Sequence, residues 1–177
     1  MRSHLLLTAI FALLVAPLLV PVFAHAGSAG PAIGSAAPEF ALPDPEGVET
    51  TLGALRAGRP VALSFWASWC SPCLQELPLL DALHERLQGV GAVIAVNVDQ
   101  ERAPADAVRT RHGLRLPVVF DASQSAVASY RPSAMPTTYV LAPDGTIRSI
   151  HRGAMDAAAV VALEAELRAL LPPPEGP

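Results

Sequence analysis

Apolar positions along the chain form unbroken runs in some places and a helical repeat in others. Two runs, at residues 61–66 and 92–98, are almost wholly apolar, which is typical of strands buried on both faces of a sheet. Between them apolar residues recur every three or four positions, which predicts a helix: Leu74, Leu77, Leu80, Leu83 and Leu87. Gly89 and Gly91 end this helix, and Pro78 should kink it because proline removes a backbone hydrogen bond.

The segments on either side extend this pattern. Residues 38–42 and 48–52 flank a turn-rich stretch and predict a short hairpin. Farther along, the sequence predicts a helix over 103–112, a strand over 116–120, a helix over 123–130, strands over 137–141 and 146–151, and a helix over 156–171. Strands that alternate with helices, then a hairpin and a closing helix, predict an α/β fold in which helices flank a central mixed sheet.

The N-terminus reads as a targeting segment. A basic start, an apolar run from Leu5 to Phe23 and Ala24-His25-Ala26 predict a signal peptide over residues 1–26. The alternative is an uncleaved membrane anchor, since the run is close to the about 20 residues that span a bilayer. N-terminal sequencing of the mature protein distinguishes the two. We expect a linker over 27–37, a folded domain over 34–171 and a disordered tail over 172–177.

Composition narrows the functional classes. Apolar residues make up 51% of the chain and charged residues 16%, which excludes charge-rich disorder. The net charge of -4 provides no basic surface for nucleic acid. With only 2 cysteines the chain is not a disulfide-dense scaffold. Those two, Cys70 and Cys73, are the feature that needs a function.

The two cysteines lie between a predicted strand and a predicted helix. Two intervening residues place both thiols on one helical turn, where they can form a disulfide. At a helix N-terminus, Cys70 faces free backbone N–H groups and the positive end of the helix dipole, which favour the nucleophilic thiolate. Cys73, farther along the helix, would resolve a mixed disulfide, and Pro72 suits the first helical turn. This arrangement favours reversible thiol–disulfide exchange.

Two other roles for the cysteine pair stay open on this spacing. A structural staple is one, although so short a loop gains little stability from closure. A metal site is the other, although it would need more ligands than one CxxC pair, and His84 and His112 are isolated in the sequence.

The stretch from Val61 to Pro78, with its Trp69-Cys70-Ser71-Pro72-Cys73 motif, resembles the thioredoxin superfamily. More narrowly, it is similar to the exported TlpA/ResA-like and CcmG (DsbE)-like thiol–disulfide oxidoreductases of the AhpC/TSA–redoxin clan. Matching segments also lie at residues 37–42, 96–99, 135–140 and 143–145. The resemblance runs from about Gly34 to Leu170. It implies a thioredoxin-like fold with an N-terminal β-hairpin extension and a central insertion.

The resemblance also assigns residues near the substrate. Pro136 would be a cis-proline that faces the cysteine pair and turns the backbone of Met135 towards the substrate chain. Thr137 and Trp69 would contact the substrate beside it. The alternatives are an ordinary trans-proline at a strand start and a plain surface tryptophan. Pro132 and Ala134 depart from the family pattern, which has valine and glycine there, so the shape of the substrate groove is in question.

By the same resemblance, Glu76 is the acidic residue that lies three positions after the second cysteine. On a helix it is one turn beyond Cys73, where a partly buried carboxylate could exchange protons with the thiols. A solvated surface glutamate is the alternative. Thioredoxin itself carries a buried aspartate in the preceding strand, and Ser64 takes that place here. Glu76 is therefore the leading candidate for proton transfer.

The direction of the reaction and the partners complete the prediction. Ser71-Pro72 carries no positive charge to stabilise a thiolate strongly, which predicts a reductant. The resemblance implies the same direction, with protein disulfides as substrates, in apocytochrome c or copper-handling proteins, and a membrane electron donor. It places the protein in the periplasm, or on the outer face of the inner membrane, of a bacterium. We expect no cofactor, no metal and no nucleic acid, and membrane contact only through an N-terminal anchor.

Three rival functions remain at this point. A peroxidase of the same fold would carry its cysteine in a loop that contains proline and threonine, a pattern absent before Cys70. A copper-binding assembly protein of the Sco type would need cysteines four positions apart and a distant histidine. A binding domain with an inert disulfide would be unaffected by replacement of Cys70.

Overall fold

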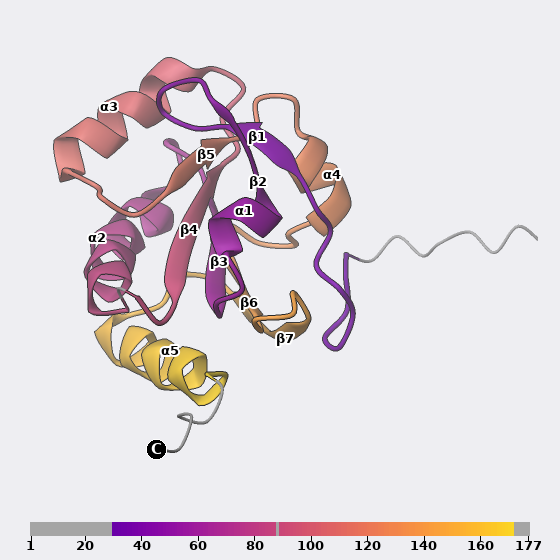
Figure 1. The fold of residues 1–177 in the computed structure, drawn as a ribbon. Helices are drawn as coiled ribbons and strands as arrows, with labels where there is room; N and C mark the ends of the chain where they lie inside the picture. Colours follow the sequence, from indigo (N-terminus) through magenta and orange to yellow (C-terminus); the bar gives the residue numbers. More distant parts are fainter. Residues whose placement is uncertain (1–29, 88, 172–177) are drawn as a thin grey trace, which may run out of the picture.

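The computed structural model describes residues 30–87 and 89–171. The predicted signal peptide over 1–26 and the predicted tail over 172–177 lie outside these residues. A five-stranded mixed sheet forms the centre, in the order β5-β4-β3-β6-β7 (Figure 1). Its strands are β3 (Val61–Trp66), β4 (Ala92–Asn97), β5 (Val118–Phe120), β6 (Thr137–Leu141) and β7 (Ile147–Arg152).

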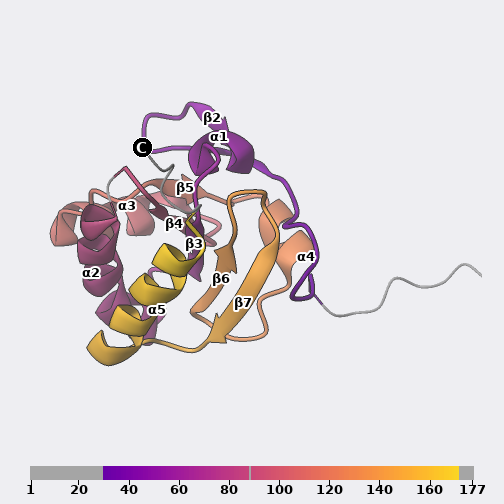
Figure 2. The same ribbon diagram turned by 60° about the horizontal axis from the view of Figure 1, so that its bottom comes forward.

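The sheet has a parallel and an antiparallel half. Strands β3, β4 and β5 are parallel and are joined through α2 (Ser71–Arg86) and α3 (Arg102–His112). Both crossovers move in the same direction across the sheet, so right-handed connections place both helices on one face. Helix α5 (Ala157–Ala169) lies on that face too, and α4 (Ser125–Tyr130) covers the other (Figure 2). The predicted α/β fold with a central mixed sheet is confirmed.

The burial of the strands explains their composition. Every residue of β3 and β4 is buried, which is why both read as continuous apolar runs. On the α4 face Phe65, Tyr130 and Tyr139 pack together, with ring centroids 5.0 to 5.8 Å apart. Helix α2 runs without interruption past Pro78, so the missing hydrogen bond does not end it. None of the helices in the described part of the chain is long and apolar enough to cross a membrane.

The N-terminal hairpin is present, with one difference from prediction. Strands β1 (Ala41–Pro43) and β2 (Glu49–Thr51) pair antiparallel. The prediction of strand through Leu52 is wrong, because α1 (Leu52–Arg56) begins there. The Thr51 hydroxyl accepts a hydrogen bond from the Ala54 N–H and thereby caps this helix. Leu52, the first residue of this helix, is buried in the core. The apolar side chain that suggested the end of a strand therefore belongs to the buried face of the helix.

The chain just before the hairpin is bound to the domain. Gly34 N–H donates to the Ile147 carbonyl at 2.8 Å, and Ala37 N–H donates to the Gly145 carbonyl at 2.9 Å. Ala36 forms a β-bridge with Thr146. Residues 34–37, which belong to both the predicted linker and the predicted domain, therefore lie against the turn between β6 and β7.

Candidate active site

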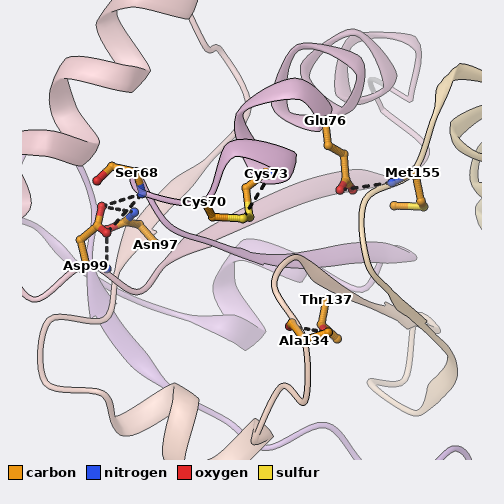
Figure 3. The surroundings of a disulfide bond; sticks show 9 residues. All are labelled: Ser68, Cys70, Cys73, Glu76, Asn97, Asp99, Ala134, Thr137 and Met155. Carbon is orange, nitrogen blue, oxygen red and sulfur yellow. Dashed lines mark hydrogen bonds between the residues drawn. A yellow bond between two sulfur atoms is a disulfide. The ribbon is translucent and has the colours of Figure 1, made fainter.

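The two cysteines form a disulfide at the start of α2 (Figure 3). The S–S distance is 2.03 Å and the Cα atoms are 5.2 Å apart. Cys70 is the residue that caps the helix, and its Sγ accepts a hydrogen bond from the Cys73 N–H at 3.2 Å. Cys70 retains 5% of its surface and Cys73 only 1%. An incoming group therefore meets Cys70 first, which suits the predicted order of nucleophile and resolving residue.

Helix α2 begins earlier than its leucine repeat indicates. It starts at Ser71, so Ser71 and Pro72 form its first turn, where the N–H that proline lacks would have no helical partner. The Cys70 sulfur thus lies at the positive end of a helix of 16 residues. Backbone N–H groups and the helix dipole favour a thiolate at that position once the disulfide is reduced.

A buried carboxylate holds the loop that precedes Cys70. Asp99, directly beyond β4, accepts hydrogen bonds from the Ser68 N–H at 3.0 and 3.2 Å and from Asn97 Nδ2 at 3.0 Å (Figure 3). Its own N–H donates to Asn97 Oδ1 at 3.1 Å. Sequence reasoning missed this role and used the segment only for resemblance. The available signal was an Asn and an Asp at the carboxyl end of a buried strand, the same sheet edge to which the cysteine loop belongs.

Glu76 lies on the other side of the disulfide and is 1% exposed. Its Oε2 accepts one long hydrogen bond, 3.4 Å from the Met155 N–H, and its Oε1 has no partner within the described structure. Burial, only partly offset by the Met155 N–H, raises the pKa of Glu76 from 4.5 to about 7. The alternative of a solvated surface glutamate is therefore wrong. Glu76 also lines a cavity of about 370 Å³ together with Met155.

The segment before β6 closes the site opposite the cysteines. The peptide bond between Met135 and Pro136 is cis, and Pro136 is buried. The Thr137 hydroxyl donates to the Ala134 carbonyl at 2.7 Å, and the Gly153 N–H donates to the Pro136 carbonyl at 2.9 Å. These bonds fix the path of the backbone although Ala134 stands where the family pattern has glycine.

A groove of about 540 Å³ lies between this segment, the residues that follow β4 and the loop that leads to Cys70. Trp69, 71% exposed, stands on one wall, and Pro132 and Met135 form the other. Asp99 and Glu101 place acidic groups along it. The structure thus brings Trp69 and Met135, which the sequence linked only by resemblance, to one apolar surface next to Cys70.

Two other positions bear on the chemistry. Ser64 is buried in β3 opposite Thr138, so an uncharged residue occupies the strand beside the cysteine pair. Nδ1 of His84 accepts the Val93 N–H at 3.1 Å and is thus used within the fold. Across residues 30–87 and 89–171 no group of three or more His, Cys, Asp or Glu side chains is arranged to hold a metal ion.

The fold and the site define a thioredoxin-like protein, with a disulfide at the amino end of the helix that follows the central strand. The AhpC/TSA family matches residues 33–150, and the chain belongs to that family. The thiol-disulfide oxidoreductase ResA of Geobacillus thermodenitrificans is 34% identical over 151 residues, which covers 84% of this chain and 86% of the relative. ResA of Bacillus subtilis is 32% identical over 123 residues, 69% and 68% of the two chains.

A solved structure agrees with these relatives. The crystal structure of a putative thiol:disulfide interchange protein DsbE from Chlorobium tepidum superposes with a TM-score of 0.73 at 31% identity. The match covers 80% of this chain and 99% of that one. The predicted resemblance to ResA/DsbE-like proteins is confirmed, and the protein is a thiol:disulfide oxidoreductase.

Proposed function

We propose that this oxidoreductase is exported and works as a reductant of protein disulfides, with Cys70 as nucleophile, Cys73 as resolving thiol and Glu76 as proton carrier. The observation that carries the proposal is the position of the cysteine pair: it caps α2 through Cys70 and lies beside a buried glutamate whose pKa is about 7. The apolar groove lined by Trp69 and Met135 supports a polypeptide rather than a small molecule as the substrate.

The reaction follows from this geometry. The Cys70 thiolate attacks one sulfur of a substrate disulfide, and the other substrate sulfur leaves as a thiolate. Cys73 then attacks Sγ of Cys70, which releases the second substrate thiol and closes the disulfide seen here. Two electrons pass from the protein dithiol to the substrate. The substrate thiols gain two protons: the one that Cys70 released when it formed its thiolate returns from water, and Glu76, one helical turn from Cys73, relays the one that Cys73 gives up.

The direction of transfer rests on the residues between the cysteines. Ser71 and Pro72 bring no cation to the sulfur, so the reduced form is not stabilised in the way that makes strong oxidants. A reductant in an oxidising compartment has to be recharged, which calls for a membrane electron donor. By resemblance, the substrates are disulfides of apocytochrome c or of copper-handling proteins. Export rests on residues 1–26, and N-terminal sequencing of the mature protein tests it.

Trapping is the decisive experiment. In a Cys73→Ser variant the mixed disulfide with Cys70 cannot be resolved, so natural partners should remain covalently joined and can be identified after non-reducing electrophoresis. A Cys70→Ser variant is the matched control and should trap nothing. Equilibration against glutathione measures the direction, and a potential well above the glutathione couple would contradict a reductant. Failure of Cys73→Ser to retain any protein through Cys70 would contradict protein disulfides as the substrate.

A further inference from the structure

A second cavity, of about 470 Å³, lies on the α4 side of the sheet near the cis-proline segment. Its walls come from the first described residues, 30–33, and from the loop between α4 and β6 and from β7. Arg131 and Ser133 line it from the loop, and Arg152 lines it from the end of β7. Two guanidinium groups around one hollow give it a positive charge in a protein whose net charge is -4.

Strand register places this cavity at the reactive edge of the sheet. Phe65, near the end of β3, pairs with Thr137 at the start of β6, and Thr137 pairs with Arg152 at the end of β7. The chain that leaves β3 reaches Cys70 within a few residues. Arg152 is therefore two strands away from β3, the strand that leads into the cysteine pair, and this separation is about 10 Å across the sheet. A polypeptide bound over the disulfide is long enough to reach it.

Neither Arg131 nor Arg152 forms a salt bridge with a carboxylate of the described residues. Arg152 Nε donates to Ser133 Oγ at 3.2 Å, and Arg131 Nε donates to the Ala128 carbonyl at 3.3 Å. Neither belongs to any of the salt bridges formed among residues 30–87 and 89–171, although Arg86, Arg102, Arg109, Arg115 and Arg168 all do. Both keep most of their donors free for a group from outside.

Local geometry directs these side chains into the cavity. Side chains alternate along β7, so Ser149 and His151 bind Glu166 of α5 on one face. Ile150 and Arg152 consequently line the cavity on the other face. In the preceding loop, Pro132 and Met135 line the groove beside the disulfide, whereas Arg131 and Ser133 line this cavity. One short loop thus separates an acid-edged groove from a basic pocket.

The remaining wall is held tightly. A Cβ atom on Gly30 would overlap the Tyr130 carbonyl oxygen, so the chain at residue 30 lies directly against the end of α4. Gly34, Ser35 and Ala37 bond to β7 and to the turn before it, which fixes the same segment from its other end. The cavity therefore exists before any partner binds, and little ordering of these walls is needed on binding.

We infer that the Arg131/Arg152 cavity is a specificity subsite that binds a carboxylate of the protein substrate, an acidic side chain a few residues from the substrate's disulfide. This inference rests on the proposed function and adds the charge pattern of the substrate. The carboxylate would accept hydrogen bonds from both guanidinium groups, and Arg geometry suits such paired contacts. The subsite orients the substrate chain over Cys70 and takes no part in electron transfer.

Synthetic peptides with one internal disulfide test the subsite. Each carries, at both ends, a spacer of about four Gly/Ser residues, whose length of about 11 Å is similar to the separation of about 10 Å between β3 and β7. The spacers end in paired Glu, paired Gln or paired Lys. With the reduced full-length protein at low salt, we expect the Glu peptide to be reduced about fivefold faster than the Gln peptide, as partly exposed ion pairs allow. Salt at about 0.5 M should remove most of the difference, because it shortens the screening length to about 4 Å.

Variants assign the effect to this cavity. Arg131→Gln together with Arg152→Gln should abolish the preference for the Glu peptide. Arg148→Gln, which removes one positive charge from an exposed position on the same strand as Arg152, should retain it. Equal rates for the Glu and Gln peptides with the unaltered protein, or a preference that survives the double substitution, would overturn the inference.

A neutral small disulfide separates this inference from the proposed function. Bis(2-hydroxyethyl) disulfide has no group for the subsite, so the unaltered protein, the double variant and the Arg148→Gln variant should reduce it at the same rate. Loss of that reaction in the double variant alone would show a structural rather than a specificity role and would overturn the subsite. Failure of the unaltered protein to reduce any disulfide would overturn the proposed function instead.

Discussion

Two buried carboxylates flank the disulfide, and the fold treats them in opposite ways (Figure 3). Asp99 is bonded to the Ser68 N–H through both oxygens and to the Asn97 amide. Glu76 has one bond of 3.4 Å and an oxygen without a partner in the described structure. Burial without such donors raises the pKa of Glu76, whereas the donors to Asp99 tie its side chain to the backbone of the cysteine loop. Asp99 therefore fixes the loop before Cys70, and Glu76 is suited to exchange protons with the thiols.

The largest effect should follow from removal of the Cys70 thiol, which lies between the two carboxylates (Figure 3). Cys70→Ser should lower disulfide exchange by at least about a thousandfold, because the remaining thiol, Cys73, is only 1% exposed and is poorly placed to begin the reaction. Reduction of a peptide disulfide, followed by thiol release, measures it. Activity that persists in this variant would place the chemistry elsewhere and end the comparison.

The pH dependence of the free energy of unfolding should differ by about 3 kcal/mol between the unaltered protein and Glu76→Gln. Its pKa is raised from 4.5 to about 7, so between these pH values the native protein keeps a proton that the unfolded chain has released. This contribution is fully present below pH 4.5 and is lost as the pH rises through 7. The oxidised protein should therefore lose about 3 kcal/mol relative to Glu76→Gln between about pH 4 and pH 8.

Denaturant unfolding of the two proteins across this range makes the measurement. Glu85→Gln is the matched control, since it removes the same charge from the same helix at a position that is paired with Arg115 at the surface. Its difference from the unaltered protein should change by less than about 1 kcal/mol. If the difference in unfolding free energy between Glu76→Gln and the unaltered protein also stayed constant with pH, the raised pKa would be contradicted.

Glu76→Gln should also slow disulfide exchange about a hundredfold, equivalent to about 2.7 kcal/mol, because general acid–base transfer is lost. The pH profile of Cys70 alkylation in the reduced protein should shift as well, since the titrating neighbour is gone. Rapid mixing with a peptide disulfide and with iodoacetamide measures the two effects. An unchanged alkylation profile would remove Glu76 from proton transfer.

Asp99→Asn should have the smallest effect and a different character. It should cost about 2 kcal/mol of stability, because an amide in that position turns one acceptor into a donor that faces N–H groups. The pH profile of Cys70 alkylation should keep its shape. Thermal unfolding and alkylation together test this. A shift like that of Glu76→Gln would mean that the two carboxylates share one role.

Asp44→Asn provides a control for Asp99. The Asp44 carboxylate also accepts hydrogen bonds from two backbone groups, the Glu46 and Val48 N–H at 3.0 and 2.8 Å, but it does so in a solvent-accessible turn. Water can replace those bonds, so this substitution should cost less than about 1 kcal/mol. An equal loss at both positions would show that burial is not what gives Asp99 its importance.

Most helices and strands were predictable because buried positions are occupied by apolar residues at a spacing that is characteristic of each element. Fully buried β3 and β4 appear as apolar runs, and α2 as a leucine repeat. The prediction failed at Leu52, where a buried apolar residue suits a strand end and a helix start equally. The start of α2 lies before its first leucine, since Ser71 and Pro72 in the first turn are exposed, and there the cysteine pair and Pro72 indicated the helix N-terminus correctly.

By itself the sequence determined the chemistry that depends on short spacing: a cysteine pair on one helical turn, and Glu76 one turn farther along. Only the tertiary structure decided the environment of these groups. Burial by distant elements raises the pKa of Glu76, and the Met155 N–H offsets part of that rise. Asp99 reaches Ser68 because β3 and β4 end at the same edge of the sheet. Arg131 and Arg152 are likewise brought to one cavity by the pairing of strands. Such effects depend on distances across the fold, which no local pattern of residues records.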